Sequence, residues 1–144
     1  MPRPQTPTLA ADAIIELVDR PGRPIVLIER KNPPPGWAIP GGFVDIGESV
    51  PDAAVREARE ETCMEVSLQC LLGCYSAPSR DPRGHTVSLI YVAQAHGEPV
   101  AADDAARVGI FDPAAIDVPL AFDHEQILRD YLHYRSTGII PTIT

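Results

Sequence analysis

The chain has 144 residues, of which 44% are hydrophobic and 22% are charged, as is ordinary for a globular protein. No internal repeat or linker divides it, so residues 1–144 are expected to form one domain with a buried core. Acidic residues outnumber basic ones by 20 to 12, which gives a formal net charge of −8. That balance excludes a general attraction to nucleic acid or to anionic lipid, so an anionic ligand needs a bound cation or a local group of arginines.

The three cysteines are odd in number and show no paired CxxC spacing. This pattern argues against a disulfide framework and against a zinc site, and it favours a reducing compartment. The N-terminal sequence lacks an uninterrupted apolar stretch of signal-peptide length, and no segment is apolar for long enough to span a bilayer. We therefore expect a cytoplasmic protein whose partners include neither a membrane nor a nucleic acid.

The N-terminal part of the chain predicts a loose arm followed by a strand hairpin. Residues 1–8 are polar and proline-rich, which is typical of an arm. Two apolar runs, 13–18 and 25–28, flank a Pro-Gly turn and predict two strands joined by that turn. A rigid proline-rich loop, 32–36, leads into a short extended piece, 37–39.

A helix of about three and a half turns is predicted over residues 50–62, because the string VPDAAVREAREET is rich in helix formers. Ser49, followed three residues later by Asp52, resembles a capping box. Pro51 is acceptable in a first helical turn.

The second half of the chain predicts strands at 66–75 and 86–95, the latter with period-two alternation. The polar loop between them is long for a hairpin, which suggests a function for it. A further strand is expected at 108–111. Apolar residues at helical spacing predict a C-terminal helix over 124–134, ended by Gly138.

Three carboxylates, Glu57, Glu60 and Glu61, fall within five residues of the first predicted helix. Their i,i+3 and i,i+4 spacing places them on one face, where like charges repel by roughly a few tenths of a kcal/mol per pair. A compensating cation is therefore expected, and hard oxygen ligands select magnesium, manganese or calcium. On the helix alone, a solvated acidic face paired with Arg56 and Arg59 explains the pattern equally well.

The residues before this helix favour the metal site. Gly41 and Gly42 bring flexible backbone near the helix, where a carbonyl oxygen can join a metal shell and a phosphate can approach without meeting a Cβ. Glu48 lies just before the cap, where a carboxylate can engage the helix N-terminus.

Residues 42–64, GFVDIGESVPDAAVREAREETCM, resemble the Nudix box, whose pattern is G-x5-E-x7-R-E-U-x-E-E-x-G-U with U a bulky aliphatic residue. The required positions are held by Gly42, Glu48, Arg56, Glu57, Glu60 and Glu61.

Two positions depart from the box, and neither supplies a catalytic group. Ala58 is small where the family prefers a larger aliphatic residue, and Cys63 replaces the closing glycine. A glycine there permits a left-handed conformation after the helix, so Cys63 either costs about 1 kcal/mol or changes the turn.

The resemblance implies an α/β fold, an α/β/α sandwich with a mixed central sheet, in which the box forms a loop–helix–loop. It implies one or more Mg²⁺ ions as cofactor, with Mn²⁺ as an alternative. The implied metal ligands are Glu57, Glu60, Glu61 and a backbone carbonyl of Gly41 or Gly42. Arg56 would orient a glutamate and Glu48 would brace the loop. A box glutamate or a carboxylate from a later loop would act as general base.

The resemblance covers most of the chain. The segments RKNPPPGWAIPGGFVDIGES, YSAPSRDPRGHTVSLIYVAQ, ADDAARVGIFD and LAFDHEQIL are similar to the ADP-ribose pyrophosphatase branch of the family. That branch implies hydrolysis of a nucleoside diphosphate derivative, ADP-ribose, to AMP and ribose 5-phosphate, by a homodimer. The substrate-binding candidates are Arg30, Trp37, Arg80, Arg83, Asp104 and His124.

Several of these candidates have a structural alternative. Arg80 and Arg83 suit a phosphate clamp or a purine contact, but Arg83 and Asp81 can also pair locally in a turn. Trp37 suits stacking on adenine or a place in the core.

Asp104 and His124 also have a structural alternative to substrate binding. Asp104 suits a base or metal ligand outside the box, or a simple turn. His124 begins the second predicted helix, so capping and solvent exposure explain it as well as substrate contact does.

Two other functions stay open. The box alone does not separate ADP-ribose from a nucleoside triphosphate or a dinucleotide. A non-catalytic ligand sensor is the third hypothesis, since related transcriptional regulators carry a Nudix-like domain, often with an eroded box. The complete set of box carboxylates and the acidic net charge favour an enzyme over a sensor.

Overall fold

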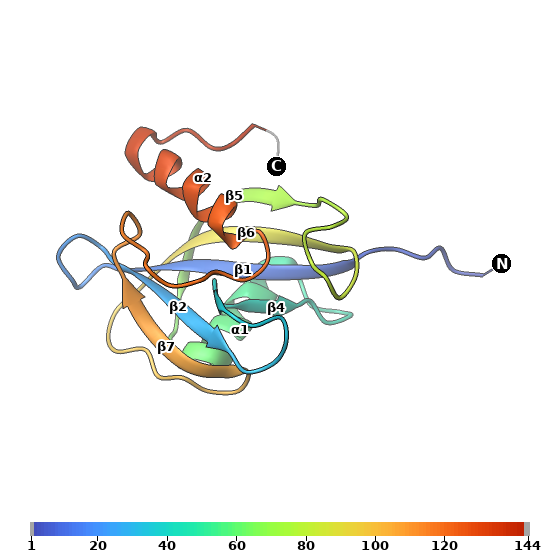
Figure 1. Ribbon diagram of the computed structural model, residues 1–144, viewed down its shortest axis with the longest axis horizontal. Helices are drawn as coiled ribbons and strands as arrows, with labels where there is room; N and C mark the ends of the chain where they lie inside the picture. The colour runs from blue at the N-terminus through green and yellow to red at the C-terminus, as the bar shows by residue number, and fades with distance from the viewer. Residues whose placement is uncertain (1, 143–144) are drawn as a thin grey trace.

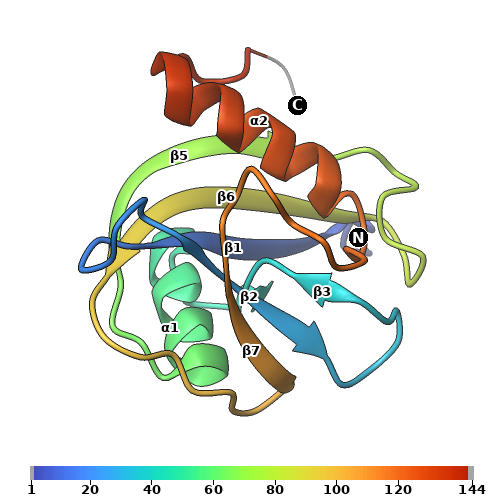
Figure 2. The same cartoon turned by 60° about the vertical axis from the view of Figure 1, so that its left-hand side comes forward.

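The computed structural model describes residues 2–142, and Met1, Ile143 and Thr144 lie outside the described residues. Within that part, seven strands form one mixed sheet with a helix against each face (Figures 1 and 2). The elements in chain order are β1 (Thr8–Leu17), β2 (Ile25–Arg30), β3 (Trp37–Ala38), β4 (Gly41–Phe43), α1 (Val50–Thr62), β5 (Ser67–Tyr75), β6 (Thr86–Ala95), β7 (Ala105–Phe111) and α2 (His124–Thr137).

Strand β1 is the centre of the sheet. It pairs in parallel with β6 and antiparallel with β2 and β4, while β5 extends the sheet beyond β6 and both β3 and β7 pair with β2. Because side chains alternate along a strand, β1 supplies both cores. Ala13 and Ile15 belong to the core that includes Ala58 of α1, whereas Ile14 belongs to the core that includes Ile127 and Tyr131 of α2. The expected α/β/α sandwich is confirmed.

Helix α1 has the predicted bounds, and the Ser49 side chain explains where it begins. The hydroxyl of Ser49 accepts a hydrogen bond from the Asp52 amide at 3.2 Å, as an N-cap does. Ala58 is fully buried against the sheet, where a small side chain lets the helix lie close to β1. This packing explains the small residue in place of a larger aliphatic one.

Strand β6 also has the predicted bounds, but other elements differ where tertiary pairing decides. Strand β1 begins at Thr8, earlier than expected, because Thr8 pairs with Thr86 of β6. This shortens the expected arm, and residues 2–7 contain no helix or strand. Strand β7 begins at Ala105 through its pairing with β2. Helix α2 runs to Thr137 and ends at Gly138, as predicted for its end.

Strand β4 was not expected, because it contains two glycines and has no β-branched residue. It exists through pairing with β1, where Asp12 lies opposite Gly41. This pairing matters for function, since it brings the glycines in front of α1.

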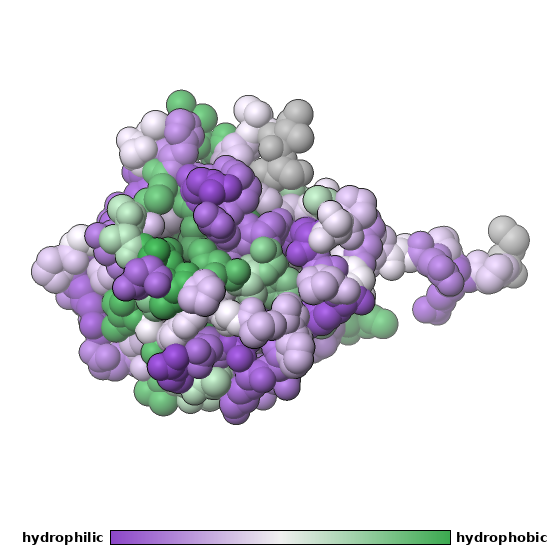
Figure 3. Space-filling view, in the orientation of Figure 1, coloured by the Kyte–Doolittle hydropathy of each residue, from purple (hydrophilic) through white to green (hydrophobic). Residues whose placement is uncertain are grey.

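An open groove of about 420 Å³ lies between α2 and the segment that follows β7. Its apolar lining includes Ile116, Val118, Leu120 and Leu128. Apolar side chains also gather in this region on the face seen in Figure 3. Neither helix of residues 2–142 is long and apolar enough to cross a membrane.

The residue that ends α1 keeps the left-handed conformation without glycine. Cys63 has φ 58° and ψ 23°, and its amide donates to the Arg59 carbonyl at 2.9 Å. The turn is therefore that of a glycine cap, and Cys63 is exposed in it. The alternative of a changed turn is wrong, and the cost of a Cβ in this conformation remains.

We predict that Cys63→Gly raises the free energy of unfolding by about 1 kcal/mol, because glycine adopts this conformation without the Cβ clash. Urea unfolding followed by circular dichroism measures the change. The control is Cys63→Ala, which removes the thiol but keeps the Cβ and should not stabilise. Equal effects of the two substitutions would contradict the explanation.

Candidate active site

Arg56 of α1 holds the preceding loop on the helix. Its Nε and Nη2 donate to the two oxygens of Glu48 at 2.6 and 2.9 Å, and Nη2 also donates to the Phe43 carbonyl at 3.1 Å. Its Nη1 donates to Glu57 at 2.9 Å and to Glu60 at 3.2 Å. The hydrogen bond from Arg56 lowers the pKa of Glu48 to about 2. The loop and the first carboxylate of the acidic face are therefore fixed by one guanidinium.

The two glycines of β4 lie directly against carboxylates. The Gly41 amide donates to Glu61 at 2.7 Å. A Cβ at Gly42 would lie 2.5 Å from Glu57 Oε1, and a Cβ at Gly41 would lie 1.7 Å from Asp12 Oδ1. At Gly41 the Cβ would also lie 2.6 Å from the Ala11 carbonyl oxygen, so close approach to backbone requires glycine there, whereas at Gly42 it would displace the end of the Glu57 side chain.

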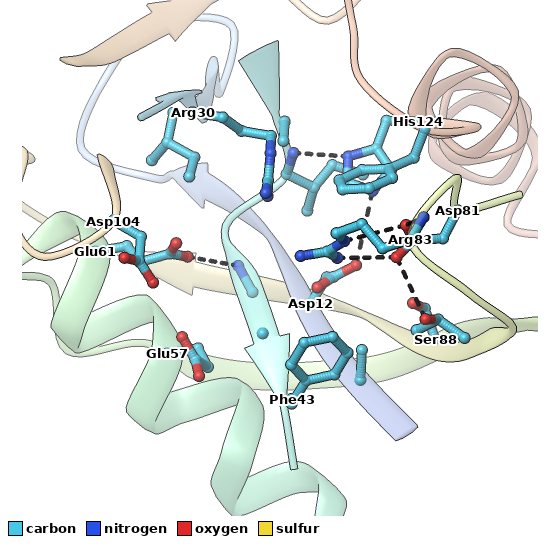
Figure 4. A pocket seen from close by; sticks show the side chains of 18 of the residues that line it. Asp12, Arg30, Phe43, Glu57, Glu61, Asp81, Arg83, Ser88, Asp104 and His124 are labelled. Carbon is cyan, nitrogen blue, oxygen red and sulfur yellow. Dashed lines mark hydrogen bonds and ion pairs between the residues drawn. The ribbon is translucent and has the colours of Figure 1, made fainter. Parts of the chain in front are cut away.

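A cavity of about 290 Å³ opens in front of these groups (Figure 4). Figure 4 shows Glu57, Glu61 and Asp104 on one side, and Asp12, Arg83 and His124 on the other. The predicted site residues that line the cavity are Arg30, Gly41, Gly42, Glu57, Glu61, Arg80, Arg83, Asp104 and His124.

The other predicted site residues lie outside the cavity lining. Glu48 and Arg56 brace the loop behind it. Glu60 is exposed on α1, with one oxygen bonded to Arg56. Trp37 is buried in the core, edge-on to Phe111 at 5.3 Å between ring centroids, which agrees with the core alternative rather than with adenine stacking.

One wall of the cavity is a layered group of arginines and aromatic rings. Arg83 lies 5.3 Å from the ring centroids of both Phe43 and Phe122, and Arg30 lies 4.9 Å from that of Phe122. Arg83 also pairs with Asp81 through Nη2 at 2.8 Å, so the local-pairing alternative is what the structure shows. Both arginines nevertheless line the cavity.

Arg80 has a different environment from Arg83. It is buried and donates to both oxygens of Asp123 at 2.9 and 2.7 Å, and to the Ser88 hydroxyl at 2.8 Å. Asp123 therefore neutralises its charge within the protein. Arg80 joins β6 to the start of α2, and these contacts do not support a phosphate clamp at this residue.

His124 is buried, so solvent exposure does not explain it. Its Nδ1 accepts a hydrogen bond from the Ile39 amide at 3.0 Å, and its Nε2 lies 3.9 Å from Asp12 Oδ2. Burial lowers the pKa of His124 to about 3, so the ring is neutral. The Nε2–Asp12 approach is therefore no ion pair.

Sequence reasoning missed Asp12, Ser88 and Phe122, which also line the cavity. A signal for Asp12 exists, because a charged residue inside the apolar run of β1 is rare unless it is paired or functional. Phe122 gives no comparable signal, although its φ of 56° is uncommon for an aromatic residue.

Burial outweighs the nearby positive charge and backbone donors at three carboxylates of the cavity. Burial raises the pKa of Asp12 to about 8, although Arg80 lowers it, and burial raises the pKa of Glu61 to about 8 as well, although the Gly41 amide lowers it. Burial also raises the pKa of Glu57, although Arg56 opposes the rise. A cluster of buried oxygens that cannot all ionise comfortably fits a hard divalent cation.

The described residues do not contain three Asp, Glu, His or Cys side chains gathered into a complete ligand set. This arrangement is compatible with magnesium, which is commonly held by one or two carboxylates and completed by water and substrate phosphates. Glu57 and Glu61 supply such carboxylates beside the Gly41–Gly42 backbone.

We predict that His124 makes the protein less stable in acid. Its pKa falls from 6.5 to about 3 on folding, so between these values the unfolded chain binds a proton that the folded chain does not. The contribution is complete above pH 6.5 and is lost as the pH falls, at about 1.4 kcal/mol per pH unit. Urea unfolding from pH 6.5 to 4 should show a shallower slope for His124→Asn.

The difference in slope between the two proteins isolates His124 from the neighbouring charges of Asp12, Asp123, Arg80 and Arg30. His124→Asn suits this comparison because its side-chain oxygen can accept from the Ile39 amide near the position of Nδ1. Identical slopes would refute the assignment of a buried neutral ring.

Comparison with known proteins supports the resemblance seen in the box. The NUDIX domain family model matches residues 7–132. An ADP-ribose pyrophosphatase of Methanocaldococcus jannaschii is 44% identical over 133 residues, which cover 90% of this chain and 76% of that protein. The ADPR responsive transcriptional repressor NtrR of Acinetobacter baylyi is 30% identical over 132 residues, which cover 86% of this chain. This chain spans about half of the repressor, 52% of its length.

A solved structure of a NUDIX domain also resembles this chain. The NUDIX domain of Shewanella oneidensis NrtR, complexed with ADP ribose, superposes with a TM-score of 0.78 at 26% identity, covering 92% of this chain and 90% of that one. With the family model matching most of the chain and Glu57 and Glu61 of the box lining the cavity, this protein is a member of the Nudix hydrolase family.

Proposed function

We propose that this protein hydrolyses ADP-ribose to AMP and ribose 5-phosphate in the presence of Mg²⁺. The observation that carries the proposal is the approach of the Gly41–Gly42 backbone to Glu57 and Glu61 on the floor of a cavity. An oxygen-rich, acidic floor binds a cation, and the cation then binds a pyrophosphate.

The relatives support ADP-ribose as the substrate. The Methanocaldococcus jannaschii protein is named an ADP-ribose pyrophosphatase, and the Shewanella oneidensis domain was solved with ADP ribose. The cavity agrees in chemistry, because its other wall offers Arg30, Arg83 and the ring of Phe122 for the remaining parts of a nucleotide.

Glu57 and Glu61 would hold the metal, together with a carbonyl of Gly41 or Gly42. Glu60 lies outside the cavity lining with one oxygen bonded to Arg56, and it would supply a further carboxylate. Members of this family generally use divalent metal ions. A divalent cation here neutralises pyrophosphate oxygens and lowers the pKa of water. Arg56 keeps Glu57 oriented throughout.

The reaction consumes one water molecule. Its oxygen attacks one phosphorus, the bridging phosphorus–oxygen bond breaks, and the leaving phosphate takes the electron pair while a carboxylate accepts the proton from water. Glu57, Glu61 and Asp104, which lie on one side of the cavity in Figure 4, are the candidates for this base. Homodimer formation and the cytoplasmic location stay predictions.

We predict that the purified protein releases AMP from ADP-ribose only with a divalent metal, and faster than from nucleoside triphosphates or dinucleotides. Glu57→Gln and Glu61→Gln should each lower kcat by about a hundredfold or more, because each removes a charge that binds the metal. Chromatographic separation of the nucleotide products measures the rates.

The matched control is Glu65→Gln. Glu65 is exposed and pairs with Arg59 outside the cavity, so its loss should leave kcat unchanged. Preference for a triphosphate would replace ADP-ribose but keep the chemistry. No turnover of any compound, with retained binding of ADP-ribose, would favour a ligand sensor like the repressor.

We also predict that Gly42→Ala weakens Mg²⁺ binding by about tenfold or more without unfolding the protein. The new Cβ would lie 2.5 Å from Glu57 Oε1, so the mobile end of Glu57 must move while the backbone stays. A tenfold loss of affinity corresponds to about 1.4 kcal/mol of binding free energy. Calorimetric titration with Mg²⁺ measures the affinity, and urea unfolding checks the fold. Unchanged affinity would argue against Glu57 as a ligand.

A further inference from the structure

His124 presents a polar atom to the cavity that the protein itself does not use. The side chain is 4% exposed and lies at the first residue of α2. The cavity lining includes both His124 and Asp12, which face each other in Figure 4.

The tautomer of His124 follows from its contacts. A neutral imidazole carries one N–H, and Nδ1 accepts the hydrogen bond from the Ile39 amide at 3.0 Å. The proton therefore lies on Nε2. Among residues 2–142, Nε2 has no hydrogen-bond partner, since Asp12 Oδ2 at 3.9 Å is too distant for one.

Asp12 supplies an acceptor opposite this donor. It projects from β1 beside Gly41 and is 6% exposed. Whether it is ionised or protonated, a carboxyl group keeps an acceptor oxygen. A gap of 3.9 Å between donor and acceptor allows one oxygen atom to lie within hydrogen-bond distance of both.

We propose that His124 and Asp12 bind one sugar hydroxyl of the substrate, with Nε2–H donating to the hydroxyl oxygen and Asp12 accepting the hydroxyl proton. This inference rests on the proposed function, because ADP-ribose carries a ribose on each side of its pyrophosphate. The two residues thereby determine specificity for the sugar.

The chemistry of the pair selects a hydroxyl over a phosphate. A hydroxyl both accepts and donates, so it uses the Nε2 donor and the Asp12 acceptor together, whereas an ionised phosphate oxygen only accepts and leaves the Asp12 acceptor unused. The nearest buried cation, Arg80, is already neutralised by Asp123. No buried polar side-chain atom of residues 2–142 lacks a partner, so the unpaired Nε2 is open to the cavity and can reach a ligand there.

The test compares His124→Asn with the wild-type protein. Asparagine keeps an acceptor for the Ile39 amide but removes the Nε2 donor. Calorimetric titration with AMP and with ribose 5-phosphate should show about tenfold weaker binding of one product and no change in the other. His133→Asn, the same change at an exposed position of α2, should change neither.

Deoxy analogues of the affected product identify the hydroxyl. The analogue that lacks the contacted hydroxyl should bind wild-type protein and His124→Asn equally. Equal binding of both products to the two proteins, equal weakening of both products, or a defect that persists with every deoxy analogue would overturn the proposal. Lack of binding of either product to the wild-type protein would overturn it too.

The hydrolysis assay tests the proposed function separately from the hydroxyl site. If the wild-type protein does not hydrolyse ADP-ribose, the catalytic proposal fails, while product titrations still report on the hydroxyl site. The imidazole signals give an independent readout, because long-range proton–nitrogen NMR should show the Nε2–H form in the free protein. A proton on Nδ1 would overturn the proposal.

Discussion

The guanidinium of Arg56 is the interaction on which the site depends. Five hydrogen bonds join it to Glu48, Glu57, Glu60 and the Phe43 carbonyl. Charge-assisted bonds of this kind are stronger than neutral ones, and the paired contact to Glu48 adds a fixed geometry. Since Phe43 ends β4, the same guanidinium also holds the glycine strand against α1.

The contacts of Arg56 help to gather carboxylates in a largely buried part of the protein. Glu57, Glu61 and Asp12 reach the cavity from α1 and from β1, and burial raises the pKa of each. Among residues 2–142, Arg56 is the only cation bonded directly to Glu57, and Glu61 is bonded to a backbone amide. The folded chain is thus electrostatically incomplete at this point, and a divalent cation with its anionic substrate would complete it.

The opposite wall of the cavity carries arginines and aromatic rings instead of carboxylates that face a metal. Arg30, Phe122 and Arg83 form a layered group whose charges are partly engaged by the protein, and the neutral ring of His124 adds a donor without adding charge. The acidic floor therefore faces a wall of aromatic rings, guanidinium groups and the Nε2 donor of His124. This division suits a ligand with a pyrophosphate at its centre and sugars beside it.

The sequence by itself determined the parts of the molecule that depend on near neighbours. Helix α1 follows from its helix formers and the Ser49 cap, and the spacing of Glu57 and Glu61 places both on one face because a helix repeats every 3.6 residues. Tertiary structure alone decided that β4 exists, that Trp37 is core, and that Asp12 meets His124 across 112 positions of chain. Those outcomes depend on strand pairing and burial between distant segments, which leave no periodic signal in the residues themselves.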